Sequence, residues 1–337
     1  MKRTPIVATA AALALVLAGC GGGGDDAEVV TDDFDALVEA AQEEGQLDWY
    51  SDLPEAIITN AVEAFEAKYD IDVSYIRSVS SQLGGRFAGE AEAGDPQADF
   101  LNIASQSFFQ EAVSQGWFSE LTDDTVDSLA DWPTEYLYDD TYALINVQPF
   151  GIAYNTETSP VQPQTWEEVA DDQLQGRLMM GDTAVVAYSG QYLHLSETLG
   201  EDYLSELGGL DPIVVDSLVP GTQQMAAGEA DVAVPSLMAV VQPLIDQGAP
   251  LEFVIPDDTT GVNQYGGVVE GAEHPNAARL FMSFLLSREG QEVITAGIAA
   301  SVLEDVPGAL ELPAEFAQVS ETDINDQQDA IDELLGF

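Results

Sequence analysis

The chain has 337 residues, of which 61 are Asp or Glu and 8 are Lys or Arg, so its formal net charge at pH 7 is −53. This acidic excess excludes nucleic acid as a partner, because the phosphate backbone would repel the protein. A hydrophobic content of 46% excludes a disordered acidic tail, and the length is typical of two domains. The acidic residues are spread along the chain without the spacing of metal ligands. We therefore expect a solvated surface suited to concentrated salt, with no metal and no cofactor.

The first residues have the composition of a secretory signal. Lys2 and Arg3 precede a mostly apolar stretch, residues 4–16, that is too short to remain as a membrane span. The letters LAGC that end it resemble the bacterial lipobox, in which the cysteine takes a diacylglyceryl group and becomes the new N-terminus. Cys20 is the only cysteine, so no disulfide can form within the chain. We therefore expect a lipoprotein signal peptide (residues 1–19), a lipidated Cys20 with a flexible tether (residues 20–45), and a protein anchored to the outer face of the cell membrane.

Short extended runs then alternate with helical segments. The predicted strands are residues 46–50, 71–76 and 98–104, and the predicted helices are residues 56–69, 80–91 and 107–118. This alternation predicts βαβ units around a largely parallel sheet, which makes the fold class α/β. Ligands bind such sheets outside the carboxyl ends of the strands. The small and polar side chains at those ends are the ligand-binding candidates of the first lobe: Ser51, Asp52, Arg77, Ser80, Ser81, Ser105 and Gln106.

The segment IRSVSSQLGGR, residues 76–86, concentrates positive charge and hydroxyl groups in a chain with few basic residues. Ser80 or Ser81 is predicted to cap the following helix and to leave first-turn N–H groups free for a ligand. Arg77 has two readings that the sequence leaves open, as a counter-charge for an anion or as a surface ion-pair partner. Arg86 lies further along the helix, where we expect an ion pair within the fold.

The pattern repeats in the second half of the chain. Predicted strands are residues 177–180, 212–217 and 230–237, and predicted helices are residues 192–200, 203–210 and 221–229. Two long extended runs, residues 143–156 and 251–271, are expected to cross between two lobes. A closing pair of amphipathic helices, residues 274–294, needs a sheet to cover, and we place it on the first lobe. We therefore expect residues 46–150 and 262–337 to form lobe I and residues 151–261 to form lobe II.

The second half also supplies candidates for the opposite side of the same site. They follow predicted strands or lie in the second crossing: Asp182, Thr183, Ser189, Gly190, Ser236, Asn263 and Tyr265. Phe150 and Tyr154 lie in the first crossing and are the expected hinge residues. His194 and His274 each stand without a second metal-ligating or catalytic partner nearby in the sequence, so we interpret both as structural.

The order of these segments resembles the type II solute-binding proteins of ABC importers, and among them the ferric-ion-binding-like branch. The resemblance covers about residues 46–335. It rests on WYSDLPEAIITNAVEAFEAKYDIDVSYI before a serine-rich turn, PQADFLNIASQSFFQEAVSQGWF, FGIAYNT, TWEEVADDQLQGRLMMGD, AAGEADVAV and HPNAARLFMSFLLSREGQ. It implies a two-lobed type II periplasmic-binding-protein fold. Each lobe is then a mixed, mostly parallel sheet flanked by helices, and extended hinge crossings join the two.

The iron branch holds its ion through a histidine, a glutamate and a pair of adjacent tyrosines. By motif, these positions fall near Pro54, near Ala104 and at Met238–Ala239. Thioether and methyl groups do not suit a hard trivalent ion. The resemblance therefore implies the fold without the tyrosine iron site, whereas the serine that the family uses after the second strand falls at Ser80.

Together these observations predict the substrate-binding lipoprotein of an ABC importer. We expect a monomer that captures a small solute between two closing lobes and delivers it to the permease. The favoured solute is an anion or anionic organic molecule, such as a phosphonate, phosphate ester or carboxylate, although the abundant acids would also suit a zwitterion or a polyamine. Ferric iron at a non-tyrosine site or with a synergistic anion, a sensor subunit, and an extracellular hydrolase stay open as alternatives. An enzyme is not expected, because no G-x-S-x-G motif occurs and the cysteine belongs to the anchor.

Overall fold

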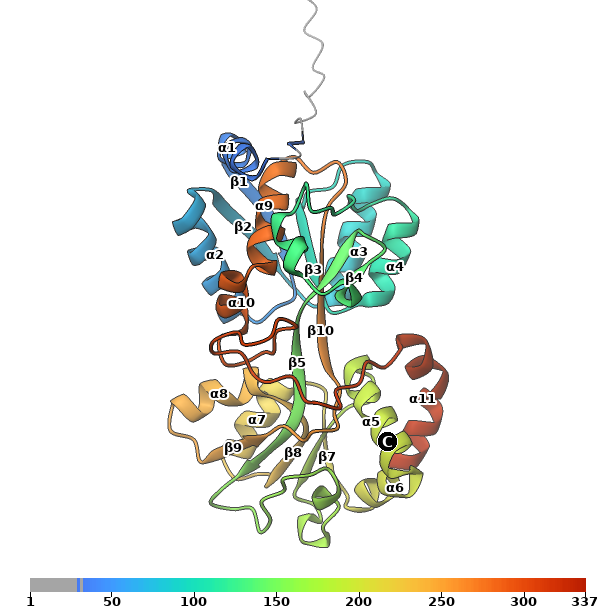
Figure 1. Cartoon of the computed structure of the whole chain (residues 1–337). Coiled ribbons are helices and arrows are strands. Elements are labelled where there is room, and N and C mark those ends of the chain that lie inside the picture. Colours follow the sequence, from blue (N-terminus) through green and yellow to red (C-terminus); the bar gives the residue numbers. More distant parts are fainter. Residues whose placement is uncertain (1–28, 31–32) are drawn as a thin grey trace, which may run out of the picture.

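The computed structural model describes residues 29–30 and 33–337, so the expected signal peptide and Cys20 lie outside the described part. Figure 1 shows two lobes, one above the other, joined by long strands. The fold is α/β and two-lobed, as the sequence predicted. None of the described helices has the length and apolar character needed to cross a membrane.

Lobe I contains a sheet with the strand order β2, β1, β3, β10, β5. Its strands β1, β2 and β3 are parallel, whereas β10 runs antiparallel to both β3 and β5. The strands are β1 (Gln46–Ser51), β2 (Asp72–Arg77), β3 (Phe100–Ile103), β10 (Gly261–Val268), the first half of β5 (Tyr142–Asn155) and the short β4 (Leu137–Tyr138). The helices are α1 (Phe34–Glu44), α2 (Glu55–Tyr69), α3 (Ser80–Glu92), α4 (Gln106–Ser114), α9 (Pro275–Leu286) and α10 (Arg288–Thr295).

Lobe II is built on the second half of β5, which pairs with β8 and β9. Parallel pairing of β6 with β7 and with β8 completes the sheet. The strands are β6 (Leu178–Gly181), β7 (Ile213–Val215), β8 (Val232–Leu237) and β9 (Leu251–Val254). The helices are α5 (Val186–Leu199), α6 (Glu201–Gly209), α7 (Leu218–Ala226), α8 (Met238–Asp246) and α11 (Glu321–Leu335).

The core of lobe I forms where α9 covers the sheet. Every residue of α9 is buried, including the polar side chains of Asn276, Arg279 and Ser283. The Phe281 ring lies 5.0 Å from Trp49, 5.0 Å from Phe65 and 5.3 Å from Phe100, measured between ring centroids. This cluster joins β1, α2, β3 and α9, and it confirms the expectation that the closing helix returns to the first lobe.

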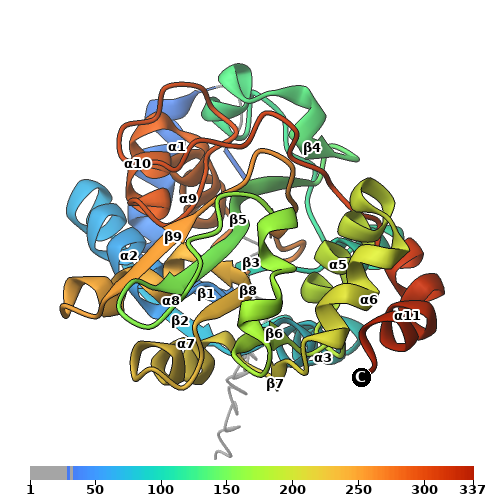
Figure 2. The same ribbon diagram turned by 90° about the horizontal axis from the view of Figure 1, so that it is seen from below.

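Two segments differ from their expected places. Residues 34–44, expected to be part of a flexible tether, form α1, which Asp33 caps and which buries Leu37 and Ala41 in the lobe I core. The expectation that lobe I extends to residue 337 is wrong, because α11 packs against α5 and α6 of lobe II (Figures 1 and 2). Its Ile324, Ile331 and Leu335 are buried in the lobe II core.

Residues 296–320 therefore form a further connection between the lobes, besides β5 and β10. This segment touches the first crossing through a bridge between Ala300 and Val147. It touches the second crossing where the backbone N–H of Ala317 donates to the carbonyl of Thr259, at 2.9 Å. Three stretches of chain thus run side by side between the lobes.

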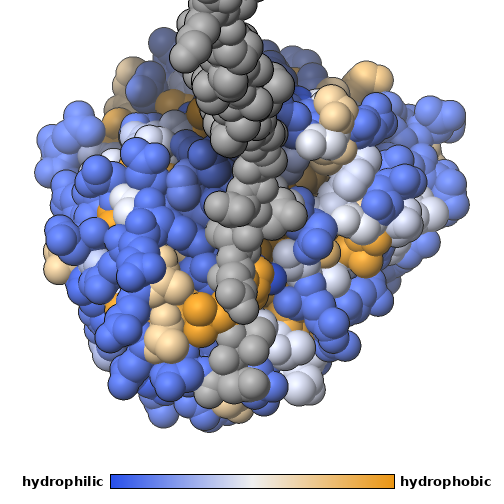
Figure 3. All heavy atoms as spheres, turned by 90° about the horizontal axis from the view of Figure 1, so that it is seen from above, coloured by the Kyte–Doolittle hydropathy of each residue, from blue (hydrophilic) through white to orange (hydrophobic). Residues whose placement is uncertain are grey.

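The surface reflects the charge of the sequence. Figure 3, seen from the lobe I end, shows hydrophilic residues over most of this face, with hydrophobic residues scattered among them. Only three ion pairs join Lys or Arg to a carboxylate among the described residues, namely Lys68–Glu289, Arg86–Glu90 and Arg177–Asp231. Most of the acidic surface is therefore without a cationic partner.

Candidate functional site

The candidate site begins where three parallel strands of lobe I end side by side. Ser51 at the end of β1 lies opposite Arg77 on β2 and Asn102 on β3. The backbone N–H of Asp52 donates to the carbonyl of Asn102 at 3.2 Å. Because the strands are parallel and in register, the turns after them meet at one edge of the sheet. These are the turns that the sequence predicted to bind a ligand.

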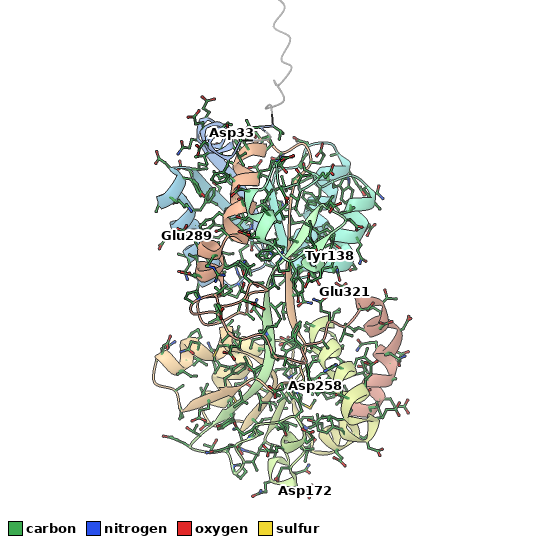
Figure 4. The ribbon with its side chains drawn as sticks, viewed as in Figure 1. Asp33, Tyr138, Asp172, Asp258, Glu289 and Glu321 are labelled. Carbon is green, nitrogen blue, oxygen red and sulfur yellow. The ribbon has the colours of Figure 1, made fainter. Side chains whose placement is uncertain are left out.

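This edge of the sheet faces lobe II. The third of these turns leads into α4, and Ser107 in the first turn of α4 donates from its backbone N–H to Glu321 of α11, at 3.3 Å. The Ser107 hydroxyl donates to the same carboxylate. In Figure 4, Glu321 lies on the lobe II side of the junction, near Tyr138 of lobe I. The strand ends of lobe I are therefore within reach of side chains from the opposite lobe.

Asp52 holds the three turns together. Its Oδ2 accepts hydrogen bonds from the Ser80 hydroxyl at the start of α3 and from the backbone N–H of Ala104, at 2.9 Å for the latter. Burial raises the pKa of this carboxyl, and the hydrogen bonds from Ser80 and Ala104 together with the nearby Gln264 amide offset only part of that rise. Its other oxygen, Oδ1, is buried and has no hydrogen-bond partner within the described residues.

Arg77 is exposed at the end of β2 and has no carboxylate partner in the described part of the chain. Its Nε donates to the carbonyl of Leu53 at 2.7 Å, which holds the guanidinium over the first turn. Its two terminal nitrogens have no hydrogen-bond partner among the residues described. The interpretation of Arg77 as a surface ion-pair partner therefore finds no support, although acidic residues are abundant in this protein.

A row of buried polar side chains crosses the lobe I sheet beside these turns. The Ser51 hydroxyl donates to Asn102 at 3.0 Å, and the Asn102 amide donates to Gln264 Oε1 at 3.2 Å. Gln264 lies opposite Asn146 on β5. Asn146 is fully buried, yet neither atom of its amide has a hydrogen-bond partner within the described residues. Such unpaired buried groups are rare, so the Asn146 amide is a candidate for contact with a ligand.

Lobe II adds further polar groups near the crossings. Ser236 pairs with Gly151 where β5 enters lobe II, and its hydroxyl is buried without a partner in the described structure. Gln191 of α5 accepts from Thr260 N at 2.9 Å, but its amide nitrogen is likewise buried and unpaired within the described chain. Asp182 lies in the turn after β6, where its carboxylate accepts from Ala184 N at 2.8 Å.

Several predicted site residues have supporting rather than exposed positions. Ser51, Thr183, Ser189, Ser236 and Tyr265 are each at most 5% exposed. The Ser189 hydroxyl donates to the Thr183 carbonyl at 2.7 Å, and Gly190 lies against Ile324 of α11. Since α5 begins at Val186, Ser189 and Gly190 lie within the first turns of this helix, and the helix begins earlier than the predicted residue 192.

The prediction that Ser80 or Ser81 caps α3 is also wrong. The cap position is Val79, without a side-chain hydrogen bond, and Ser80 is the first helical residue. Its hydroxyl bonds to Asp52 instead of to the helix backbone. Ser105 does cap α4, since its hydroxyl accepts from Phe108 N at 3.3 Å. Ser81 is exposed in the first turn of α3 and Gln106 is half-buried at the start of α4.

Tyr265 and Asn263 lie on β10, close to the predicted hinge. Tyr265 belongs to an aromatic cluster with Phe109, Tyr138 and Tyr142, and burial raises the pKa of its hydroxyl. Asn263 is half-buried, and its carbonyl oxygen lacks a partner in the described chain. The expected hinge residues Phe150 and Tyr154 are buried on β5 in the lobe II core.

Three polar residues were missed by the sequence reading: Asn102, Asn146 and Gln191. The first two interrupt buried apolar runs, FLNI on β3 and ALINVQ on β5. A polar residue in a strand that is otherwise apolar is a usable signal, because burial without a partner is costly. Gln191 has no comparable signal, since its neighbours on α5 are themselves mixed.

The remaining predictions concern basic residues and histidines. Arg86 forms the expected ion pair within the fold, with its Nε 2.8 Å from Glu90. His194 contacts Asp258, and His274 Nδ1 lies 2.9 Å from Asp99, so both histidines have local acidic partners.

One group of side chains in the described structure has the spacing of metal ligands. Ligand atoms of Asp48, Asp99 and His274 lie within 4.8 Å of one another. They lie beside the first residues of β1 and β3, away from the strand ends described above. Both oxygens of Asp99 already accept backbone N–H bonds, from Asp48 at 2.7 Å and from His274 at 2.9 Å. Both carboxylate oxygens of Asp99 are therefore already engaged in hydrogen bonds within the fold.

Sequence comparison places the chain in a family. The profile of bacterial extracellular solute-binding proteins matches residues 50–297, well over half of the chain. An uncharacterized protein of Haemophilus influenzae is 28% identical over 273 residues, which cover 77% of this chain and 78% of that relative.

Solved structures share the architecture. The substrate-binding protein of an ABC transporter from Agrobacterium tumefaciens matches with a TM-score of 0.71 and 18% identity, over 88% of this chain and 96% of that one. Iron-bound HitA from Pseudomonas aeruginosa matches with a TM-score of 0.68 and 19% identity, over 87% of this chain and 99% of that one. AfuA from Actinobacillus pleuropneumoniae, with fructose-6-phosphate bound, matches with a TM-score of 0.62 and 24% identity, over 87% of this chain and 99% of that one. At these identities the likeness shows the fold alone, which is the two-lobed type II fold of periplasmic binding proteins. The profile match shows that the chain belongs to the bacterial extracellular solute-binding proteins.

Proposed function

We propose that this protein captures a small anionic solute between its lobes and delivers it to an ABC permease in the membrane. The favoured solutes are phosphate esters, phosphonates and carboxylates. The observation that carries the proposal is that the guanidinium of Arg77, beside three polar turns, has no carboxylate partner among the described residues, in a protein of net charge −53. A carboxylate would reach such a cation easily, so its unpaired state favours a role in binding a solute anion.

The neighbouring groups suit the same task. The first turn of α3 supplies backbone N–H groups close to Arg77, and a helix N-terminus favours an anion by roughly 0.3–1 kcal/mol. Charge-assisted hydrogen bonds contribute about 1.5–3 kcal/mol each. Three or four of them would approach the roughly 8 kcal/mol of micromolar binding before the entropy of association is deducted.

Two structural relatives have different ligands in their descriptions, namely fructose-6-phosphate for AfuA and iron for HitA. The phosphate ester is the better fit to the polar turns of this chain. Ferric iron, alone or with a synergistic anion, is the second candidate. It is disfavoured because the metal-ligand group found among the described residues, Asp48 with Asp99 and His274, lies at the opposite ends of the strands.

The test compares Arg77→Gln with Arg86→Gln at high salt. Arg86 is the matched control, because it lies in the same segment but is paired with Glu90. We expect phosphate esters to raise the melting temperature of the parent protein and of Arg86→Gln, and to lose most of this effect in Arg77→Gln. Tight binding of ferric ion with no response to anionic organics would instead favour the iron alternative.

The location and the partners are proposed on the same basis. An extracytoplasmic place follows from the family. We propose in addition that Cys20 carries a lipid anchor and that the protein works as a monomer with its permease, without catalysis or a cofactor. Growth with the solute after deletion of the permease separates transport from a sensor role, and turnover of candidate esters would revive the hydrolase alternative.

A further inference from the structure

We infer that the Asp52 carboxylate accepts a hydrogen bond from the solute. The solute would then carry an ammonium or hydroxyl group as well as an anionic group. This inference rests on the proposed function, because it concerns the second half of the same ligand. It makes Asp52 a specificity-determining residue beside the anion-binding Arg77.

The first argument is the unequal use of the two carboxylate oxygens. Asp52 Oδ2 accepts from the Ser80 hydroxyl and from Ala104 N, at 2.9 Å for the latter. These contacts fix the orientation of the carboxylate. Oδ1 is buried and unpaired in the described structure. An acceptor in this state is unfavourable unless a partner arrives, and the candidate partner is a donor on the bound solute.

The second argument is that Arg77, at the end of the neighbouring strand, forms no ion pair with Asp52. Ser51 and Arg77 are opposite one another on β1 and β2, so Asp52 follows directly beside Arg77. No ion pair joins Asp52 and Arg77, both of which the structure describes, and the guanidinium is held instead by the Leu53 carbonyl at 2.7 Å. Two opposite charges on adjacent turns that do not neutralise each other are available for two groups of one ligand.

The third argument excludes two simpler roles for Asp52. A purely structural link between α3 and the turn before α4 would use Oδ2 alone, and an asparagine would serve it equally well. A metal ligand would need further carboxylates or histidines, but the metal-ligand group in the described chain does not include Asp52. The Gln264 side-chain amide lies near enough to lower the pKa of Asp52 by hydrogen bonding. It does not reach hydrogen-bond geometry with Oδ1, which has no partner within the described residues.

The test uses three phosphate esters of matched size: propyl phosphate, 2-hydroxyethyl phosphate and 2-aminoethyl phosphate. We expect the parent protein to bind the hydroxyl or amino compound more tightly than propyl phosphate by about 10-fold or more, the range of a charged hydrogen bond. Calorimetric titration at high salt gives the three affinities. A preference for the amino compound indicates an ammonium, and one for the hydroxyl compound indicates an alcohol.

Asp52→Asn distinguishes the inference from a general effect of the amino or hydroxyl group. We expect the affinities of this variant for the three compounds to lie within about threefold of one another, because the amide lacks the negative charge that favours a hydrogen-bond donor. Asp326→Asn, an exposed change on α11, controls for net charge and should keep the preference. The melting temperature of each variant verifies that it is folded.

The outcomes separate the two proposals. If all three esters bind the parent protein equally and lose affinity in Arg77→Gln, the anion proposal stands and the role of Asp52 is refuted. If none binds, the anionic solute itself is wrong. Native mass spectrometry of the purified protein supplies an independent result, because a retained anion without any N–H or O–H donor would overturn the inference directly.

Discussion

Glu321, the first residue of α11 on lobe II, caps the first turn of α4 on lobe I by accepting the Ser107 backbone N–H at 3.3 Å. The Ser107 hydroxyl donates to the same carboxylate. The positive end of a lobe I helix is thus satisfied by a carboxylate from the other lobe. Because this contact joins the two lobes, we expect it to favour their closed arrangement, and we call it the latch.

Glu321→Ala is expected to open the protein in the absence of solute. The latch is partly exposed to solvent, so its loss should weaken lobe closure by about 1 kcal/mol rather than by the larger amount typical of buried pairs. The measurement is the radius of gyration by small-angle X-ray scattering. Glu333→Ala, an exposed change in the same helix, is the control and should leave the radius unchanged. An identical radius for both variants would show that the latch does not bias closure.

Arg177→Met is expected to destabilise lobe II in a pH-dependent way. Arg177 donates to both oxygens of Asp231, at 3.0 and 2.6 Å. Burial alone would raise the pKa of Asp231, but the hydrogen bonds from Arg177 and Thr158 and the charge of Arg177 lower it below its usual value. Because the Arg177 side chain is 37% exposed, we expect a loss of about 2 kcal/mol at neutral pH, less than for a fully buried pair.

The sign of the pH effect follows from that lowered pKa. The ionised form of Asp231 is stabilised in the folded protein, so the contribution is present above the ordinary carboxyl pKa of about 4 and is lost as the pH falls through the folded value. Urea unfolding of both proteins between pH 3 and pH 7 should show that the difference in their unfolding free energies becomes smaller in acid. Arg288→Met is the control, because Arg288 donates to the carbonyls of residues 304 and 305 and its loss should not depend on pH. Arg177 also donates to the carbonyls of Gly228 and Glu229, and that part of the loss should remain in acid. A difference in unfolding free energy that is as large at pH 3 as at pH 7 would contradict this account.

Asp52→Asn is expected to stabilise the protein at neutral pH. Burial raises the pKa of Asp52, so the folded protein binds a proton there more readily than the unfolded chain does. Stability is therefore lost as the pH rises through the folded value, and the ionised carboxylate is unfavourable at pH 7. An uncharged amide should gain on the order of 1 kcal/mol at pH 7. The gain should vanish below the ordinary carboxyl pKa, and chemical unfolding at both pH values decides the point.

Gly151→Ala is expected to disturb the passage of β5 into lobe II. A Cβ at this position would lie 2.3 Å from the Val254 carbonyl oxygen and 2.5 Å from the Phe253 ring. Overpacking of this kind costs about 1–3 kcal/mol. Gly85→Ala is the matched control, because a methyl group at that position on α3 would have no atom within 4 Å, and alanine favours a helix by up to about 1 kcal/mol. Guanidinium unfolding should give opposite signs for the two changes.

The strand ends of lobe I could be predicted because the carboxyl ends of parallel strands lie at the same edge of a sheet, whatever the order of the strands. An apolar run followed by a polar turn places Ser51, Asp52 and Arg77 at one edge whatever the details of packing. The cap of α3 could not be predicted in the same way. Ser80 has the residue type of a helix cap, but its hydroxyl has a better partner in Asp52, which is brought near only by the fold.

The positions of α1 and α11 depend on tertiary packing alone. The pattern of α11 predicts an amphipathic helix, but it does not say which lobe its apolar face covers. Ile324 packs in the lobe II core and lies against Gly190, where a larger residue on α5 would push α11 away. That complementarity joins residues 134 positions apart in the chain (324 minus 190), and local patterns do not encode it.

The last prediction concerns the acidic surface. A net charge of −53 with three described Lys or Arg ion pairs leaves strong repulsion among surface carboxylates. Raising the salt from about 0.1 M to 1 M shortens the screening length from about 10 Å to about 3 Å, which weakens repulsion between neighbouring carboxylates. Since the folded state holds these charges closer together than the unfolded chain does, we expect the melting temperature to rise with sodium chloride. Sucrose is the control, because it favours the compact state without screening charge. Equal melting temperatures in dilute buffer and molar salt would refute the salt-adapted surface, whereas a rise in salt that sucrose does not reproduce would assign the effect to charge.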